Sequence, residues 1–289
     1  MRLIARGREI DFPRRPLIMG ILNINDDSFS GDGRIDPIWA LKRAAELTAL
    51  GADIIDVGAE SARTNRAPIS CEEEVRRLVP FLEGFEEAVA SVPPRDDVQV
   101  YPPLLSVNTW RPDVAGPVMR RGGHILNDMG ALPDPANARI CAETGAALLI
   151  MHSLGAPKEK HTHVGYDDVI ATLTDFFQQK LAMAGAAGVG RESTILDPGI
   201  DFAKQAPDNL RILRETEALA RLGRPVLLPI SRKSVIGRVL GIADPRERDP
   251  ATAACLVAGT LRGASIFRVH NVEMAWRVLV SMDKLAAHT

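Results

Sequence analysis

The sequence predicts an α/β fold, a (β/α)₈ TIM barrel with a short N-terminal hairpin, formed by a single domain over residues 1–289. Three observations predict it. Eight short apolar runs recur along the chain, amphipathic segments separate them, and polar residues follow each run directly. In such a barrel, parallel strands alternate with helices and the chemistry lies at the carboxyl ends of the strands. The sequence therefore locates a candidate site before it reveals the chemistry.

The apolar runs are short and uninterrupted, which is typical of parallel strands that are buried on both faces. In chain order they are Leu17–Leu22, Asp53–Val57, Leu104–Val107, His124–Leu126, Ala146–Ile150, Thr194–Leu196, Val226–Ile230 and Ser265–Val269. The polar residues that follow them are Asn23, Glu60, Asn108, Asn127-Asp128, His152, Asp197, Ser231-Arg232-Lys233 and His270.

Start and stop signals delimit the helices expected between these runs. Asp36 followed by Pro37 predicts the start of the first helix, because proline is favoured at the first helical position. Ser70 with Glu73 reads as a capping box for the second. Gly51 and Gly145 each precede an apolar run, as a helix-terminating glycine does.

Three segments fall outside this alternation. Met1–Arg15 has a glycine between two short apolar stretches and predicts a hairpin that closes the barrel floor. Val92–Pro103 is charged and proline-rich, which favours a surface insertion. Leu154–Gly165 is a long loop on the catalytic side, where such loops often form lids. A plain solvated connection is the alternative for each segment.

Composition excludes several classes of protein. With 46% hydrophobic residues and a net charge of −2, the chain is neither disordered nor strongly basic, so no nucleic-acid partner is expected. Cys71, Cys141 and Cys255 lack metal-ligand spacing and favour a reducing compartment. The first residues do not resemble a signal peptide, and no apolar run approaches a membrane span. We therefore expect a cytoplasmic protein with no membrane association.

Polar groups at the strand ends indicate the kind of ligand. Asp197 and Asn127 suit a flat heterocycle with adjacent N–H donors, because a carboxylate pairs with such an edge through both oxygens. Lys233 can meet a ring carbonyl. Arg268 and His270 alternate along one strand and suit a phosphate-type anion near a helix start. The pattern favours an aromatic heterocycle that bears a phosphate group.

Seven motifs, in register along the chain from about Pro16 to Met282, resemble those of the dihydropteroate synthase family. They are Met19–Ser30, Asp56–Arg63, Leu126–Asp128, Met151-His152, Leu196–Gly199, Ser231–Ser234 and Arg268–His270. The resemblance implies a transferase of folate biosynthesis. Such an enzyme condenses 6-hydroxymethyl-7,8-dihydropterin pyrophosphate with p-aminobenzoate and gives 7,8-dihydropteroate and pyrophosphate.

The resemblance also implies roles for individual residues. Asn127, Asp197 and Lys233 would hold the pterin, with Asn108 and Met151 near its ring. Arg268 would cover the pterin face and, with His270 and Asn23, engage pyrophosphate. Mg²⁺, the one implied cofactor, would bridge Asn23 and the pyrophosphate. Arg63, Phe202 and Ser234 would border the slot for p-aminobenzoate. Sulfonamides mimic p-aminobenzoate and would bind in the same slot. The family is typically homodimeric.

Several residues depart from the family pattern. Asn108 stands where an aspartate is normal, so a negative charge near the pterin is lost. Ala62 and Thr64-Asn65 depart from the family pattern in the second loop, which follows the second predicted strand. Asp201 and Ala203 stand where the family has glycines. The pterin-and-anion half of the site is well kept, whereas the arylamine half is not.

The substituted positions leave alternatives open. The first is a paralogue that binds a pterin or its pyrophosphate without efficient synthesis. The second is a methyltransferase of the related pterin-binding barrels, and the third is an unrelated phosphate-binding barrel. Purely structural roles are also possible for single residues. Arg232 could be structural, and Asp56 and Asp128 could pair with backbone or capping groups. His152 could be a hydrogen-bonded histidine of the barrel. A metal site at His161 and His163 is disfavoured, because no further ligands stand at fixed spacing.

Overall fold

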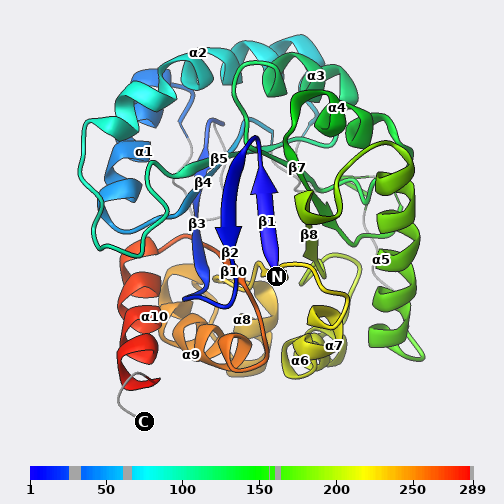
Figure 1. The fold of residues 1–289 in the computed structure, drawn as a ribbon. Helices are drawn as coiled ribbons and strands as arrows, with labels where there is room; N and C mark the ends of the chain where they lie inside the picture. The colour runs from blue at the N-terminus through cyan, green and yellow to red at the C-terminus, as the bar shows by residue number, and fades with distance from the viewer. Residues whose placement is uncertain (26–33, 61–66, 156, 160–163, 287–289) are drawn as a thin grey trace.

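A computed structural model describes residues 1–25, 34–60, 67–155, 157–159 and 164–286. Its main sheet has eight parallel strands in the order β8-β7-β6-β5-β4-β3-β10-β9. A parallel bridge between Leu196 and Val226 joins the two ends of this order, and Leu196 N donates to Pro225 O at 3.0 Å. The sheet therefore closes on itself, and the predicted (β/α)₈ barrel is confirmed (Figure 1).

The strands coincide with the predicted apolar runs to within a residue or two at each end. They are β3 (Leu17–Asn23), β4 (Ile54–Gly58), β5 (Leu104–Asn108), β6 (Ile125–Asp128), β7 (Ala147–Met151), β8 (Thr194–Asp197), β9 (Leu227–Leu228) and β10 (Ile266–Val269). The run Val226–Ile230 gives only the two residues of β9 as a strand. Pro229 has no N–H to donate to the ladder, which accounts for the early end.

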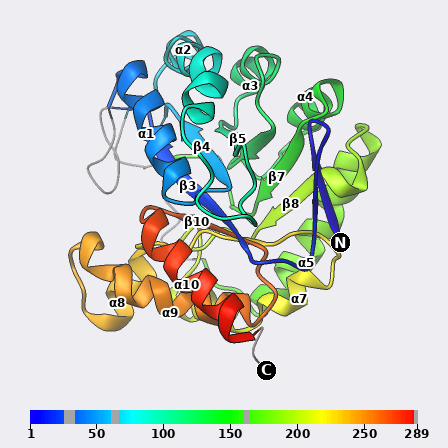
Figure 2. The same cartoon turned by 60° about the vertical axis from the view of Figure 1, so that its left-hand side comes forward.

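Helices form a ring outside the strands (Figure 2). They are α1 (Pro37–Ala49), α2 (Cys71–Ala90), α3 (Pro112–Met119), α4 (Ala136–Thr144), α5 (Val169–Ala186), α6 (Ala206–Arg214), α7 (Thr216–Ala220), α8 (Ser234–Leu240), α9 (Asp249–Thr260) and α10 (Val272–Ala286), with 3₁₀ turns η1 (Arg191–Ser193) and η2 (Pro245–Arg248). The predicted starts hold. Asp36 caps α1 through Ile38 N, and Ser70 caps α2 through Glu73 N.

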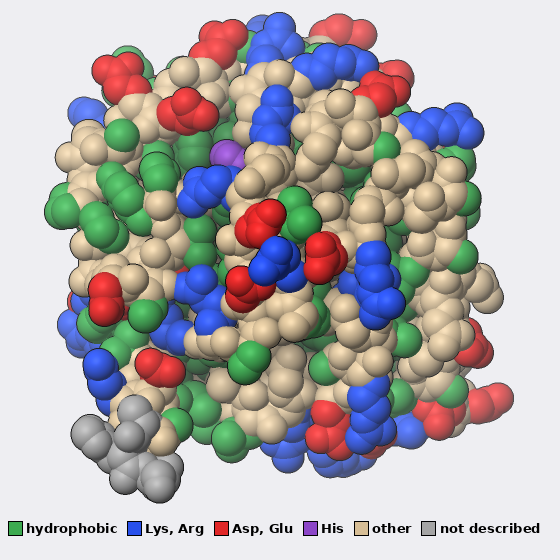
Figure 3. All heavy atoms as spheres, in the orientation of Figure 1, with side chains coloured by type: hydrophobic (Ala, Val, Ile, Leu, Met, Phe, Trp, Pro, Cys, Tyr) green, Lys and Arg blue, Asp and Glu red, His purple; other side chains and the backbone are tan. Residues whose placement is uncertain are grey.

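The N-terminal hairpin closes the amino-terminal end of the barrel, as the sequence predicts. Strands β1 (Arg2–Ala5) and β2 (Arg8–Asp11) pair antiparallel and lie across the barrel in Figure 1. Leu3, Ala5 and Ile10 are buried in one cluster with the first residues of several barrel strands. Burying a leucine or isoleucine contributes about 2–3 kcal/mol. The hairpin is thus an apolar plug, and Figure 3 shows basic and acidic side chains interspersed over its outer face.

The segment 92–103 also belongs to this floor, so the alternative of a plain solvated connection is wrong for it. Gln99 is buried and its Nε2 donates to Thr48 O at 2.9 Å and to Ala52 O at 2.8 Å. Arg95 lies over the Trp276 ring at 3.9 Å from its centre, and Asp96 accepts from Trp276 Nε1 at 2.6 Å. These contacts attach the segment to the end of α1 and to α10.

No helix within the described residues is long and apolar enough to span a membrane.

Candidate active site

The predicted polar residues gather at the carboxyl ends of the strands. Asn23 ends β3, Asn108 ends β5, Asn127 is the next-to-last residue of β6 and Asp197 ends β8. Lys233 lies in the loop after β9, directly before α8, and Arg268 lies within β10. Because all eight strands are parallel, these residues share one end of the barrel. The location that the sequence predicts is confirmed.

A carboxylate that sequence reasoning assigned to backbone or capping groups forms the middle of this arrangement. Asp56 is fully buried in β4 and bonds three side chains instead. Its Oδ1 accepts from Ser106 Oγ at 2.6 Å and from Asn127 Nδ2 at 3.1 Å, and its Oδ2 accepts from Arg268 Nε at 2.7 Å. The earlier interpretation of Asp56 is wrong. Its charge fixes Arg268 and orients the Asn127 amide.

The Asn127 amide and the Asp197 carboxylate retain capacity for a ligand. Asn127 is 3% exposed, and its Oδ1 atom has no hydrogen-bond partner among the described residues. Asp197 Oδ1 accepts from Gly199 N at 2.7 Å. Burial raises the pKa of Asp197 to about 6, against the Gly199 amide and nearby Lys233. An unfilled buried acceptor such as Asn127 Oδ1 is costly, and a ligand with an N–H donor would satisfy it.

A buried lysine that the sequence did not single out stands behind Asp197. Lys204 Nζ lies 2.9 Å from His152 Nδ1 and donates to Phe202 O at 3.0 Å. Burial lowers the pKa of Lys204 to about 7, whereas Asp197 opposes that change. Burial and the adjacent ammonium lower the pKa of His152 to about 3, so this ring is neutral. His152 is a hydrogen-bonded barrel histidine, packed edge-on against Phe176.

Glycine 199 is required by the close approach of two strand ends. Its φ is +67°, and an added Cβ would lie 2.0 Å from His152 O. A side chain there would push β7 and β8 apart and remove the amide that Asp197 accepts from.

Lys233 is held over an aromatic ring. Its Nζ donates to Ile200 O at 2.9 Å and lies 4.6 Å from the centre of the Phe202 ring. Burial lowers its pKa, while the carboxylates of Asp201 and Asp197 oppose this. The ammonium and the aromatic face therefore lie side by side at the mouth of the barrel.

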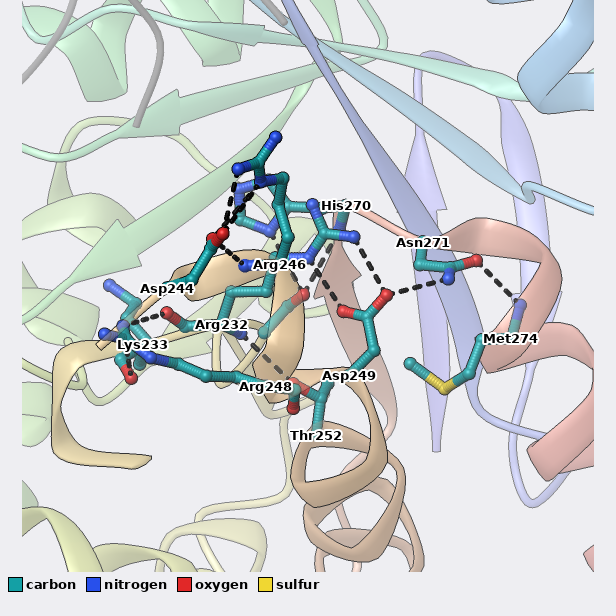
Figure 4. Close-up of polar contacts among 11 residues, drawn as sticks. Arg232, Lys233, Asp244, Arg246, Arg248, Asp249, Thr252, His270, Asn271 and Met274 are labelled. Atoms are coloured by element: carbon teal, nitrogen blue, oxygen red, sulfur yellow. Dashed lines mark hydrogen bonds and ion pairs between the residues drawn. The ribbon is translucent and has the colours of Figure 1, made fainter. Parts of the chain in front are cut away.

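A network behind Lys233 and His270 anchors the loop after β9 (Figure 4). Arg232 pairs with Asp249 through two bonds of 2.7 and 2.8 Å, and Asn271 Nδ2 donates to the same carboxylate at 2.8 Å. Arg232 is structural, as expected. Ser231 Oγ lies 3.1 Å from His270 Nδ1, so the loops after β9 and β10 are joined directly.

The loops after β8 and β9 are joined by the carboxylate of Asp201. Asp201 Oδ2 accepts from Ser234 Oγ at 2.9 Å and from Val235 N at 3.1 Å, and Arg238 donates to Oδ1 at 3.0 Å. The φ angles of Asp201 and Ala203 are +67° and +50°, a region that favours glycine. The family glycines at both positions thus match the backbone, and this chain keeps that backbone without them.

Asn108 and Met151, which the resemblance places near a pterin ring, differ in their surroundings. Asn108 is 6% exposed, and its Nδ2 lies 3.0 Å from Met129 Sδ. Met151 is buried in the apolar cluster inside the barrel, together with Leu149 and Ile195. A role for Met151 at a ligand ring stays a prediction.

Comparison with known proteins agrees with this geometry. The family described as "Pterin binding enzyme" matches residues 19–270. Dihydropteroate synthase of Escherichia coli is 37% identical over 274 residues, which cover 94% of this chain and 92% of that protein. The chain belongs to the dihydropteroate synthase family. Two solved structures of the family extend the match to the whole fold.

The dihydropteroate synthase of Yersinia pestis, solved with a sulfonamide drug complex, has a TM-score of 0.88 at 33% identity and covers 100% of both chains. The enzyme of Xanthomonas albilineans, solved with 4-aminobenzoic acid, has a TM-score of 0.84 at 31% identity, covering 99% of this chain and 98% of that one. These relatives support a synthase over the methyltransferase and the unrelated barrel.

Several residues named in the sequence analysis lie outside the described residues. They are Arg63, the substitutions Ala62 and Thr64-Asn65, the end of the motif Met19–Ser30, and His161 with His163. Next to the second loop, buried Glu60 pairs with Arg111 and Lys158, each at 2.6 Å. Lys158 belongs to the long loop after β7, so this pair of contacts joins the loops after β4, β5 and β7. The sequence predicts Glu60 at the end of a strand. It does not predict the partners of Glu60, because both lie far along the chain.

Proposed function

We propose that this chain condenses 6-hydroxymethyl-7,8-dihydropterin pyrophosphate with p-aminobenzoate to give 7,8-dihydropteroate and pyrophosphate in folate biosynthesis. The observation that carries the proposal is the pair of buried acceptors, Asn127 Oδ1 and Asp197, at the carboxyl end of the barrel. Membership of the family and the similarity to synthases over nearly the whole chain support it.

Recognition of the pterin follows from complementary donors and acceptors. A pterin presents an amino group and ring N–H donors along one edge and a carbonyl oxygen at another. Asp197 and Asn127 Oδ1 accept from the first edge, and Lys233 donates to the carbonyl. Because Asp56 holds the Asn127 amide through its Nδ2 atom, the oxygen faces the ligand without reorganising.

Loss of the diphosphate requires positively charged groups that stabilise the negative charge of the leaving group. Asp56 holds Arg268 by its Nε atom, which fixes the guanidinium for the leaving diphosphate and for the pterin face. Ser231 positions His270 beside it. The C–O bond breaks with its electron pair on the diphosphate, and the arylamine nitrogen then forms the C–N bond and gives up one proton. Asp56 and Asp197 are the negative groups near the developing cation.

Asn23 is the residue of this site that could bind Mg²⁺, as one ligand among several. Within the described part of the chain, no three acidic, cysteine or histidine side chains gather around a point that would hold a metal. Asn23 supplies an amide oxygen at the end of β3. A magnesium ion accepts one such ligand and completes its shell with phosphate oxygens and water. We therefore propose that Asn23 would hold Mg²⁺ together with the diphosphate, where the ion would supply positive charge for the leaving group.

We place the arylamine slot between the loops after β8 and β9. Phe202 supplies an apolar wall, Ser234 a hydroxyl and Arg63 a cation from the second loop. The relative solved with 4-aminobenzoic acid and the one solved with a sulfonamide drug support an arylamine substrate and sulfonamide competition.

The test is pyrophosphate release by the purified protein with the pterin pyrophosphate and Mg²⁺, with and without p-aminobenzoate. Formation of dihydropteroate above background is the expected result. Tight pterin binding with neither release nor product would instead favour the non-catalytic paralogue, which Asn108 and the altered second loop motivate.

We further propose a homodimer and a cytoplasmic location. Exposed apolar side chains on α6, α8 and α9 support the first: Leu210, Val239, Leu240, Val257 and Leu261 are 36–73% exposed. The three free cysteines, Cys71, Cys141 and Cys255, support a reducing compartment. Sedimentation of the wild type and of L261E tests the dimer, since a charge within that patch would dissociate it.

A further inference from the structure

Asp201 stands out because all of its side-chain contacts are with groups at the arylamine border or with the segment that supports it. Ser234 Oγ and Val235 N donate to Oδ2 at 2.9 and 3.1 Å, and Arg238 donates to Oδ1 at 3.0 Å. The side chain is 9% exposed although the residue lies in a surface loop. This carboxylate is therefore a fixed part of the loop rather than a solvated charge.

The backbone around Asp201 is also held in place. Asp201 N donates to Asn209 Oδ1 at 2.9 Å, and Asn209 Nδ2 donates back to Asp201 Oδ1 at 3.2 Å. These bonds hold a non-glycine residue at a φ of +67°. Strain of this kind persists where the surrounding structure fixes it, and it gathers at functional sites.

The charge of Asp201 acts on the proposed site itself. The Asp201 carboxylate, together with that of Asp197, raises the pKa of Lys233 against the effect of burial. Phe202, the next residue, lies under the Lys233 ammonium. A negative charge thus lies beside the proposed arylamine slot, and its partners include the Ser234 hydroxyl expected to meet the substrate.

We propose that Asp201 is a specificity-determining residue that disfavours an anionic arylamine. Its carboxylate holds the Ser234 and Val235 donors, so the carboxylate of p-aminobenzoate must compete for them and approach a like charge. A neutral arylamine meets no such repulsion. The inference rests on the proposed function, because it assigns the slot to an arylamine.

The experiment compares D201N with the wild type on two substrates, p-aminobenzoate and its neutral analogue p-aminobenzamide. Removal of one partly screened like charge is expected to lower KM for p-aminobenzoate about tenfold. KM for p-aminobenzamide and for the pterin pyrophosphate should stay within about twofold, since neither depends on that charge. D201G, which suits the positive φ, should shift selectivity in the same direction.

A matched control is D11N, which removes one aspartate charge from the hairpin at the other end of the barrel, where Asp11 pairs with Arg2 at 2.7 Å. It should change neither KM. Equal changes for both arylamines in the Asp201 variants, or a higher KM for p-aminobenzoate, would overturn the proposal and leave Asp201 a loop-stabilising residue.

Failure of the proposed function is distinguishable from failure of this inference. If the wild type forms no dihydropteroate, calorimetric binding of the same two arylamines to wild type and D201N replaces the kinetic readout. An unchanged ratio of the two affinities in D201N would refute the role of Asp201, whatever the outcome for turnover.

Discussion

Asp53 lies at the amino-terminal end of β4 and Asp197 at the carboxyl end of β8, and burial raises the pKa of each carboxyl to about 6. Their surroundings differ. Asp53 accepts from Ile18 N and from Val100 N, both at 2.8 Å, and Arg15 lies 3.8 Å away. Within the described residues, Asp197 accepts one bond, from Gly199 N. The fold supplies a donor to each oxygen of Asp53, whereas at Asp197 it supplies a donor to one oxygen and leaves the other for a ligand.

The largest expected effect is on pterin affinity. In D197N the carboxylate that accepts two ring donors becomes an amide, and a mismatched N–H then faces the ligand. We expect the affinity for the pterin to fall about 100-fold or more, since charge-assisted bonds are each worth about 1.5–3 kcal/mol. Calorimetry with a pterin ligand measures it, and unchanged affinity would refute the pterin edge assignment.

The corresponding substitution at the other end of the barrel, D53N, should lower the stability of the fold and leave the pterin affinity unchanged. The amide cannot accept both buried N–H groups, and Arg15 loses a partner in the floor. The free energy of unfolding should fall by about 2–4 kcal/mol, as for other broken buried polar networks. Urea denaturation measures this change, while pterin affinity should stay as in the wild type. A variant that lost affinity and kept its stability would break the comparison.

The pH dependence of pterin binding should follow Asp197. The pterin edge requires the ionised carboxylate, so affinity is present above the pKa of about 6 and is lost as the pH falls through that value. In K204M the loss of a nearby cation should move this midpoint upward and weaken binding at pH 6 roughly tenfold. Calorimetric titrations from pH 5 to 8 test both expectations. The control is K180M. Lys180 lies on α5 and donates to Leu132 O.

The smallest effect is expected from N108D. A carboxylate beside the pterin adds negative charge near the developing cation, so turnover should be preserved or raised, by up to about tenfold. Steady-state kcat measures it. A large fall in kcat would show that the pocket around Met129 is organised differently from that of the family.

Local sequence patterns predicted most of the scaffold. The hairpin, the barrel and the strand ends carrying Asn23, Asn127, Asp197 and Lys233 lie where the apolar runs and turn residues placed them. The exceptions have local reasons as well. β9 is short because Pro229 cannot donate, and the segment 92–103 packs into the floor because Gln99 satisfies carbonyl oxygens at the end of α1 and before β4.

The sequence by itself determined which residues reach the carboxyl end of the barrel, because strand periodicity and capping are properties of neighbouring residues. Only the tertiary structure decided how those residues pair. Asp56 meets Arg268 across 212 positions, Lys204 meets His152 across 52, and Asp201 meets Ser234 across 33. Such pairs depend on barrel closure and on the stagger of parallel strands. The roles of Asp56, Lys204 and Asp201 therefore became visible only once distant strand ends were brought together.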